Sequence, residues 1–569
     1  MKTLVLLLII GSVYAEFNLL LMHNNDMHAR FEETSQTSGK CKNKSYCFGG
    51  FARVAHVVRE ARNAAKDGTG PSVLYLNAGD TYTGTPWFSV HKWKIAVDFL
   101  NTLAPDAMSF GNHEFDFGIK GILPFLRNYK HPLVAANFDY SKEPLFTAEV
   151  NKSVVLNVNG HKIAVIGYIT PETRVISDVG YIEFLDEVES IKKESERLDA
   201  EGVKIIIALG HSGFEVDKSI AKNVPLVDVV IGGHTNTFLW NGKQPDIEVP
   251  EDIYPTVMIQ KSGKKVPVVQ AYAYTKYMGK LYTTFDDEGE LIQFQGKPQL
   301  LNHLIPQERD MLDLLETYRE PVDALSKKTV GRTRVSLDSS TCRKKECNFG
   351  NLITDAMVAQ KAFQYGGYYW TDTPIAVMNG GSIRTTIDIG SITVEDIIAA
   401  QPFDLQYISF NLTGSDLKKM LETSARSNGE TSRGEFLQVS GLQVTYDLEK
   451  PVGSRVEDVK VRCGQCKIPQ YEDLDLKKIY RILGNSYILN AGDGYDILRD
   501  KAFGKKIEDL GDKDTTVWYL EKEQFVYPDE TGRITVLKQV KGNSSSRISI
   551  LSVWTYLVVA CLSAWHKLH

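Results

Sequence analysis

The segment of residues 111–118, Gly-Asn-His-Glu-Phe-Asp-Phe-Gly, places an amide, an imidazole and two carboxylates between two glycines. The amide oxygen of Asn112 suits a hard or borderline metal ion, and the imidazole of His113 can act as an acid or hold a phosphate. Asp116 follows three residues after His113, where its carboxylate can orient that imidazole. A polar turn at the end of a strand would explain this segment equally well, so the choice depends on the rest of the chain.

Four other short apolar segments, each with the length of a buried strand, also end in side chains that bind metals. The segments are residues 17–22, 73–76, 203–209 and 227–231, and the side chains that follow them are Asp26 with His28, Asp80, His211 and His234. Any one of these histidines could be structural on its own. Five such strand ends in one chain favour a shared metal site.

The candidate ligands are carboxylate, imidazole and amide groups, namely Asp26, His28, Asp80, Asn112, His211 and His234. These donors suit zinc, manganese or iron. Six ligands are more than one tetrahedral zinc ion uses, but they fit two divalent ions about 3.5–4 Å apart that share one carboxylate. Such a pair of ions holds the attacking and leaving oxygens of a phosphoryl displacement.

Helical and strand-like patterns alternate over residues 17–240 and must position these side chains. Residues 51–65 and 91–103 have apolar positions at helical spacing, and residues 154–169 suggest a hairpin that turns at Asn159-Gly160. The pattern predicts an α/β layered domain with its ligands gathered at one edge of the sheets.

The motifs D-x-H, G-D, G-N-H-E-F-D, G-H and G-G-H, in this order, resemble those of the calcineurin-like metallophosphoesterases, and GNHEFDFG resembles the 5′-nucleotidase family within them. The resemblance implies an N-terminal four-layer α/β/β/α metallophosphoesterase domain, a linker helix and a C-terminal α/β substrate-binding domain. It implies two divalent metal ions, preferably zinc, with manganese or another divalent metal as alternatives. By the same resemblance, one ion is held by Asp26, His28, Asp80 and His234, the other by Asp80, Asn112 and His211, and His113 and Asp116 form a catalytic dyad that stabilises the transition state.

The second half of the chain contains side chains that could bind a nucleotide. Arg343 and Arg384 can fork onto phosphate oxygens, Phe403 and Tyr487 have flat faces that can sandwich a base, and Asp493 can accept hydrogen bonds from ribose hydroxyls. Taken singly, each could be a surface arginine, a core aromatic or a turn residue. The resemblance favours binding, because these five residues and Asn379 lie on the substrate-binding motifs of the family.

Two departures from the family pattern leave substrate preference open. Thr354 stands where vertebrate members carry a cysteine of a further disulfide, so that disulfide is absent. The segment after Pro402-Phe403 runs directly into Asp404-Leu405 without a glycine-containing insertion. Because that loop borders the base pocket, the preferred base and phosphate-chain length cannot be assigned from the sequence.

Both ends of the chain and the cysteines indicate export. Residues 1–15 have the basic start, short apolar core and small residues of a signal peptide. The cysteines fall into local couples that suit disulfides: Cys41 with Cys47, Cys342 with Cys347, and Cys463 with Cys466. Cys463 and Cys466 could instead be redox-active or half of a zinc site, but no second CxxC completes a metal cage.

Sequons at Asn43, Asn151 and Asn411 could carry glycans. Small residues around Ser544 precede a mostly apolar stretch that ends at residue 565, which resembles a GPI-attachment signal with Ser544 or a neighbour as the attachment site. The polar spacer is shorter than the usual length of about 8–12 residues. A short membrane anchor is the alternative, although Ser552 and Thr555 interrupt the stretch.

A chain of 569 residues is too long for one core. We expect a signal peptide at 1–15, a metallophosphoesterase domain at 16–305, a linker helix at 306–325 that Glu320-Pro321 breaks, a nucleotide-binding domain at 326–541 and a GPI-attachment signal at 542–569. The net charge of −6 gives no reason to expect a nucleic-acid polymer as partner.

The resemblance implies an ecto-5′-nucleotidase that passes through the secretory pathway to the cell surface and converts extracellular AMP to adenosine and phosphate. A GPI anchor would hold it in the outer membrane leaflet, or it could be released in soluble form. An apyrase that cleaves ATP and ADP to AMP is the first alternative, and an inactive surface module is the second. A homodimer formed through the C-terminal domain is a further option.

Overall fold

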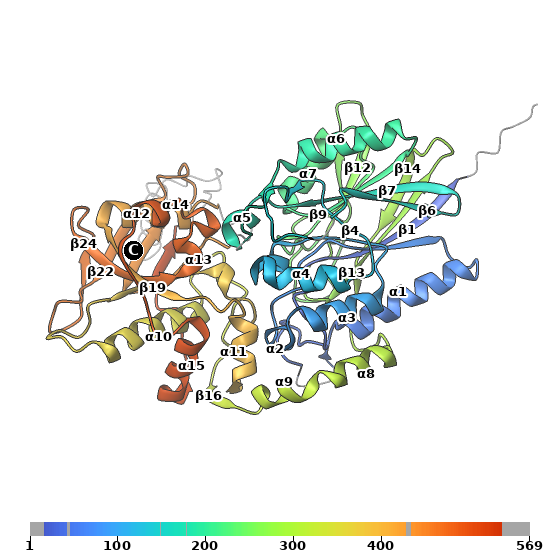
Figure 1. The fold of residues 1–569 in the computed structure, drawn as a ribbon. Coiled ribbons are helices and arrows are strands. Elements are labelled where there is room, and N and C mark those ends of the chain that lie inside the picture. The colour runs from blue at the N-terminus through green and yellow to red at the C-terminus, as the bar shows by residue number, and fades with distance from the viewer. Residues whose placement is uncertain (1–15, 42–45, 148–149, 178, 428–433, 538–569) are drawn as a thin grey trace, which may run out of the picture.

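The computed structural model of the protein describes residues 16–41, 46–147, 150–177, 179–427 and 434–537. The predicted signal segment, the sequon at Asn43 and the tail that contains Ser544 lie outside the described residues. The chain forms two parts with separate cores, one built from β1 to β15 and the other from β16 to β27 (Figure 1). The predicted two-domain α/β architecture is therefore confirmed.

Two sheets face each other in the N-terminal part. One has the strand order β14-β13-β1-β2-β3-β4, with β15 paired to β13, and the other has the order β11-β12-β10-β9-β7-β6. The strands of the first sheet are β1 (Phe17–Asn24), β2 (Ser72–Asn77), β3 (Ala107–Ser109), β4 (Leu133–Val134), β13 (Tyr277–Phe285), β14 (Leu291–Gly296) and β15 (Gln299–Leu300). Those of the second are β6 (Ser153–Val158), β7 (His161–Ile169), β9 (Ile205–His211), β10 (Val229–Ile231), β11 (Thr256–Ile259) and β12 (Lys265–Val269), and the short strands β5 (Phe138–Asp139) and β8 (Glu183–Phe184) pair separately.

Helices cover the outer face of each sheet, which completes four layers (Figure 1). The helices are α1 (Phe51–Lys66), α2 (Pro86–His91), α3 (Trp93–Leu103), α4 (Gly118–Asn128), α5 (Thr173–Ile176), α6 (Glu187–Ala200) and α7 (Phe214–Asn223). Strand β1 shows why the sequence gives this arrangement. Leu19 and Leu21 pack between the two sheets while Leu20 and Met22 pack under α1 and α3, so both faces are buried and the strand reads as a continuous apolar run.

Two local predictions can be compared directly with the structure. The hairpin of β6 and β7 turns at Asn159 and Gly160, whose φ angles of 52° and 89° suit a type I′ turn. The predicted linker segment contains two helices, α8 (Arg309–Thr317) and α9 (Arg319–Ser326), which meet at Tyr318, two residues before the predicted break at Glu320-Pro321. Pro321 lies in the first turn of α9, where its missing N–H has no helical partner to lose.

The C-terminal part contains sheets with the strand orders β20-β17-β24-β19-β25, β23-β22-β21-β27 and β18-β16-β26. Their strands are β16 (Thr329–Thr333), β17 (Ile375–Asn379), β18 (Gly390–Thr393), β19 (Tyr407–Thr413), β20 (Leu437–Ser440), β21 (Leu442–Tyr446), β22 (Val456–Arg462), β23 (Tyr471–Asp473), β24 (Ile479–Asn485), β25 (Phe503–Ile507), β26 (Phe525–Val526) and β27 (Ile534–Val536). The helices are α10 (Asn348–Gln364), α11 (Val394–Ala400), α12 (Gly414–Ser424), α13 (Ser486–Leu489), α14 (Asp496–Lys501) and α15 (Asp512–Glu523).

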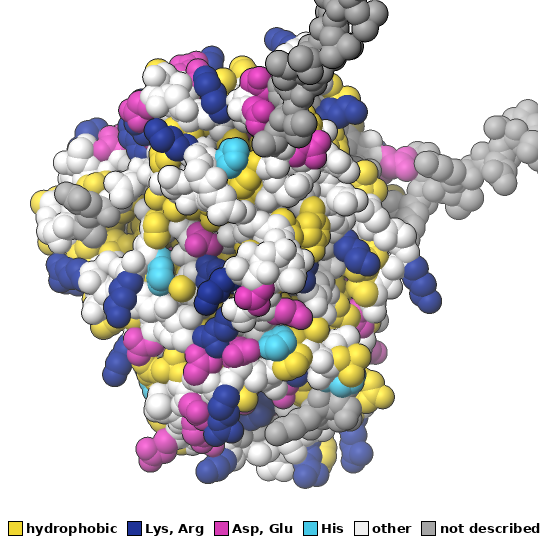
Figure 2. All heavy atoms as spheres, turned by 90° about the vertical axis from the view of Figure 1, so that its right-hand side faces the viewer, with side chains coloured by type: hydrophobic (Ala, Val, Ile, Leu, Met, Phe, Trp, Pro, Cys, Tyr) yellow, Lys and Arg dark blue, Asp and Glu magenta, His cyan; other side chains and the backbone are white. Residues whose placement is uncertain are grey.

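The surface features bear on the export prediction. The disulfides Cys41–Cys47, Cys342–Cys347 and Cys463–Cys466 are present, as predicted. Asn151 is exposed, whereas Asn411 is half-buried within β19. Figure 2 shows a face on which acidic and basic side chains are interspersed. Among the described residues, no helix combines the length and the apolar character that crossing a membrane requires.

Candidate active site

Side chains from strand ends in both sheets of the N-terminal part converge on the carboxylate of Asp80. Its Oδ2 lies 2.9 Å from Nε2 of His211 and 3.8 Å from Nε2 of His28. Oδ1 of Asp26 lies 3.6 Å and 3.7 Å from the same two nitrogens. All four side chains are almost fully buried. The carboxyl ends of β1, β2 and β9 therefore meet where the pattern of polar strand ends placed a shared site.

The loops that carry these side chains adopt unusual backbone conformations. The φ angles are 50° at Asp26, 44° at His28, 57° at Asp80 and 80° at His234. These values lie in the left-handed region, which residues other than glycine rarely adopt. Such conformations cost about 1–3 kcal/mol each and persist where the surroundings fix them. Gly111 allows the backbone to approach Asp80 closely, because a Cβ at this position would lie 2.1 Å from Oδ1 of Asp80.

Backbone carbonyls orient the buried imidazoles. Nδ1 of His28 lies 3.1 Å from the oxygen of Thr83, and Nδ1 of His211 lies 2.7 Å from the oxygen of Ala78. In each ring this leaves Nε2 facing the carboxylates. Ligand histidines in metal sites are held in the same way.

The residues present fit divalent metal ions. Oδ1 of Asp26 is buried without a hydrogen-bond partner, which a bound cation would supply. Burial lowers the pKa of His28 and of His234 to about 4, so both imidazoles are neutral and can coordinate. Although burial disfavours a charged ring, Asp80 and Asp26 raise the pKa of His211 to about 10, which shows how strongly this cluster attracts positive charge.

The sequence prediction grouped His234 with Asp26 and His28, and the structure shows a further neighbour of this imidazole. Nδ1 of His234 lies 2.9 Å from Oδ1 of Asn112, and His234 clusters with Asp80 and His211. The imidazole of His234 therefore lies beside Asn112, while its backbone N–H donates to Oδ2 of Asp26 at 3.0 Å. The loop before β11 also supplies an oxygen that the sequence analysis missed, because Oδ1 of Asn236 is buried without a partner. Its position two residues after His234 was the available signal.

His113 and Asp116 lie beside the candidate ligands. Nδ1 of His113 is 2.9 Å from Oδ2 of Asp116, and its Nε2 faces Oδ2 of Asp80 at 3.9 Å. Both residues belong to the turn around the 3-10 helix η2 (Asn112–Phe115), which brings positions three residues apart onto one side. Burial works against the charged ring, but Asp116 and Asp80 outweigh it and raise the pKa of His113.

Glu114 is a further site residue that the sequence analysis did not single out. Its carboxylate accepts hydrogen bonds from the backbone N–H groups of Gly111 at 2.6 Å, Asp80 at 2.9 Å, Thr81 at 2.7 Å and Tyr82 at 3.2 Å. Burial and the neighbouring Asp80 raise its pKa to about 7. Glu114 thus joins the loop that carries Asp80 to the loop that carries Asn112.

We expect Glu114→Gln to destabilise the protein and weaken metal binding. An amide has one acceptor oxygen, so two of the four N–H groups lose their partner, at about 1–3 kcal/mol each. Denaturant unfolding and metal analysis measure the two effects.

Glu143→Gln is the matched control, because this buried carboxylate also accepts from two backbone N–H groups, those of Leu145 and Tyr181, neither of which belongs to a candidate metal ligand. It should lower stability without loss of metal. Equal metal loss in both variants would contradict a specific role for Glu114.

Side chains of the C-terminal part reach the same place. Nη2 of Arg384 lies 2.8 Å from Nε2 of His28. The ring of Phe403 stacks on His113, with a centroid distance of 5.1 Å and an interplanar angle of 14°. Arg384 also covers Phe403, with Cζ 5.5 Å from the ring centroid. The candidate site is therefore composed of both parts of the chain.

The remaining predicted substrate residues form a second cluster around Asp493. Its Oδ1 accepts from the Tyr487 hydroxyl and its Oδ2 from Nδ2 of Asn379, each at 2.8 Å. Arg343 lies in the loop closed by the Cys342–Cys347 disulfide, and burial lowers its pKa. The predicted sandwich pairs Phe403 with Tyr487, whereas the ring on which Phe403 stacks in this structure is His113.

Comparisons with known proteins match both parts. Residues 19–238 match the model of the calcineurin-like phosphoesterases, and residues 329–500 match that of the 5′-nucleotidase C-terminal domain. A protein of Lutzomyia longipalpis called 5NUC is 44% identical over 551 residues, which cover 94% of this chain and 96% of that protein. A mouse 5′-nucleotidase is 41% identical, covering 95% of each chain.

Two further relatives bear on fold and substrate. An apyrase of Tabanus yao is 38% identical, covering 92% of this chain and 94% of its own. The crystal structure of a 5′-nucleotidase precursor from Thermus thermophilus superposes with a TM-score of 0.83 at 34% identity, covering 92% of this chain and 100% of that one. The likeness extends through both parts of the chain.

Proposed function

The chain belongs to the 5′-nucleotidase family of calcineurin-like phosphoesterases, and from this premise we propose that it hydrolyses nucleoside 5′-monophosphates such as AMP to nucleoside and phosphate. The observation that carries the proposal is the 2.8 Å approach of Arg384 to His28. It sets a guanidinium that can fork onto phosphate against the candidate metal ligands. A phosphate bound between them would lie where a displacement at phosphorus needs it.

Two divalent ions would be held by the converging donors. One ion would be bound by Asp26, His28, Asp80 and the amide oxygen of Asn236, which has no hydrogen-bond partner. The other ion would be bound by Asp80, Asn112, His211 and His234. When bound, such ions lower the pKa of water and neutralise charge on the phosphoryl group. Zinc is the preferred metal because imidazole and carboxylate donors suit it, with manganese as the alternative.

The chain's own side chains would hold the rest of the substrate. Arg343 and Arg384 would bind the phosphate, Asp493 the ribose hydroxyls, and Phe403 and Tyr487 the base, with Asn379 fixing Asp493. His113, oriented by Asp116, would stabilise the charge that develops on the phosphoryl oxygens. Because Phe403 rests on His113, base binding and the phosphate site would be directly adjacent.

Apyrase activity is a second candidate. One relative carries the name apyrase. In addition, the chain runs directly from Phe403 to Asp404 without the glycine-containing insertion of the family pattern, so the loop beside the base pocket differs from that pattern. The complete set of candidate ligands and the intact dyad speak against an inactive module.

The test is phosphate release from AMP, ADP and ATP in parallel, with and without a chelator. We expect AMP to be the best substrate and the chelator to abolish release. Faster release from ATP and ADP, with AMP as the final product, would establish an apyrase instead. No release from any nucleotide by metal-loaded protein would refute both.

The site of action would be outside the cell. The disulfides and the signal-like residues 1–15 support export, and the tail around Ser544 supports GPI anchoring in the outer leaflet. The proposal also includes glycans at Asn43, Asn151 and Asn411 and a homodimer formed through the C-terminal domain. It sets the domain limits at 16–305 and 326–541, with a linker at 306–325.

A further inference from the structure

Three arginines act electrostatically on one tyrosine, Tyr274, at the edge of the candidate metal site. Cζ of Arg30 lies 4.5 Å from the centroid of its ring. The charges of Arg384, Arg30 and Arg343 all act on the Tyr274 phenol. Nη2 of Arg384 lies 2.8 Å from Nε2 of His28, whose ring neighbours that of Tyr274. Within the described residues, none of these arginines forms an ion pair with a carboxylate. Three buried or half-buried cations that no described carboxylate contacts at ion-pair distance leave a place for an anion.

The phenol of Tyr274 points among the candidate ligands. Its backbone N–H donates to the oxygen of Asp26 at 2.8 Å, and its ring centroid lies 5.6 Å from that of His28. Its hydroxyl oxygen lies 3.5 Å from Nδ2 of Asn236. The side chain is only 6% exposed, so little bulk water competes for the hydroxyl.

The backbone around Tyr274 is held in a strained conformation. Tyr272, Tyr274 and Thr275 have φ angles of 57°, 60° and 60°, which are outliers for bulky and β-branched residues. Asn25 fixes this segment by donating to the oxygen of Tyr272 at 2.6 Å and accepting from the N–H of Ala271 at 2.8 Å. Strain that the fold maintains is typical of segments that position functional groups.

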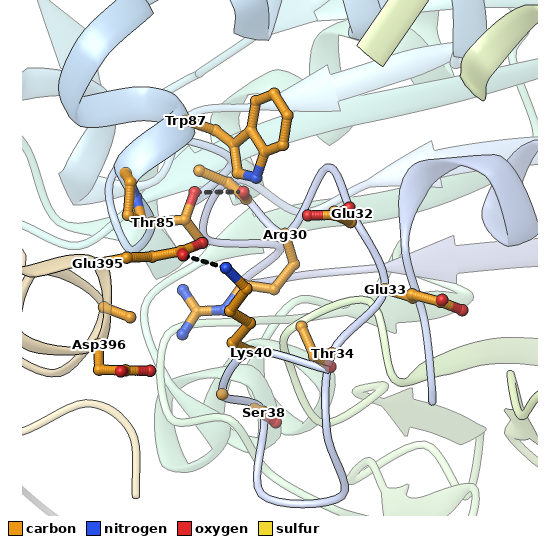
Figure 3. Close-up of a pocket in the computed structure, with 14 residues that line it drawn as sticks. Arg30, Glu32, Glu33, Thr34, Ser38, Lys40, Thr85, Trp87, Glu395 and Asp396 are labelled. Carbon is orange, nitrogen blue, oxygen red and sulfur yellow. Dashed lines mark hydrogen bonds and ion pairs between the residues drawn. The ribbon is translucent and has the colours of Figure 1, made fainter. Parts of the chain in front are cut away.

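Arg30 supplies a fixed charge on the face of the ring. Its Nη1 donates to the oxygens of His28 and Gly84, whereas Nε and Nη2 have no hydrogen-bond partner. It lines the small pocket of Figure 3, between the N-terminal part and α11. There Lys40 pairs with Glu395 at 2.5 Å. A cation on a phenol face makes the hydroxyl a better donor.

We propose that Tyr274 is a further substrate-contacting residue, whose hydroxyl donates a hydrogen bond to the phosphate bound by Arg343 and Arg384. The assignment rests on the proposed nucleotide hydrolysis. It extends the phosphate site by a neutral donor from the N-terminal part, which faces the two arginines of the C-terminal part.

Tyr274→Phe tests the assignment, because it removes the hydroxyl and keeps the ring that covers Arg30. Tyr272→Phe is the matched control, since it removes a hydroxyl from the neighbouring tyrosine of the same strained segment. We expect Tyr274→Phe to lower kcat/KM for AMP by about 10- to 100-fold, as for a hydrogen bond to a charged group. Inhibition by inorganic phosphate should weaken by a similar factor. Three other properties should match those of Tyr272→Phe: inhibition by adenosine, the metal content and the midpoint of unfolding.

Each other outcome decides against the assignment. Equal kinetics in the two variants would show that the hydroxyl does not contact phosphate, while the proposed function would stand. Loss of metal from Tyr274→Phe, or equal weakening of its inhibition by adenosine and by phosphate, would show that Tyr274 has a structural role. Failure of the wild-type protein to hydrolyse any nucleotide would refute the proposed function, and the Tyr274 assignment with it.

Discussion

Asp80→Ala is expected to abolish phosphate release from AMP while the protein still folds. Oδ2 of Asp80 faces both His28 and His211, so it is the carboxylate that would serve both ions. Its Oδ1 also accepts from the N–H of His113 at 2.9 Å. Removing the carboxylate therefore removes a shared ligand and a contact that fixes the catalytic loop. Metal analysis should show loss of both ions, and activity should fall to background.

Asp228→Asn is the control for Asp80→Ala. Asp228 is as deeply buried as Asp80 and accepts a hydrogen bond from the N–H of Ile206 at 2.8 Å. It pairs with Lys264 and lies at the amino end of β10, whereas the candidate ligands follow the carboxyl ends of the strands. We expect this variant to retain its metal and its activity. Undiminished turnover by Asp80→Ala, or by chelated wild-type protein, would contradict the two-metal proposal.

The sequence could predict six of the candidate ligands because each lies at the end of an apolar strand or shortly after it. A parallel strand brings its carboxyl end to a known edge of the sheet, so Asp26, Asp80 and His211 could be gathered without coordinates. The α/β class followed from the same alternation of strands and helices.

What the sequence could not predict depends on contacts between distant segments. Glu114 accepts hydrogen bonds from N–H groups more than thirty residues away, and its place between His113 and Asp116 does not reveal those contacts. The pairing of His234 with Asn112 spans 122 residues and joins two different sheets. Phe403 was predicted to face a base, but its stacking on His113 depends on how the two parts of the chain meet.

His113→Ala should lower kcat by about 10²–10⁴-fold, the range for a positioned acid or base, without loss of metal. The opposing possibility has structural support, since His113 clusters with His28 and Asp80 in a group that could itself hold an ion. Two contacts argue for the catalytic role. Nδ1 is engaged by Asp116, and Nε2 stands 3.9 Å from Asp80, on the side where Arg384 would hold the phosphate.

Asp116→Asn separates the two roles of His113 further. The amide can still contact Nδ1, but it no longer favours the charged imidazole, so kcat should fall by less than in His113→Ala. Metal content should equal that of wild type in both variants, because neither residue would be a ligand. If His113→Ala instead loses an ion in proportion to its activity, His113 is a metal ligand. The charge on the phosphoryl oxygens must then be stabilised by the ions, Arg343, Arg384 and Tyr274 without a separate catalytic imidazole.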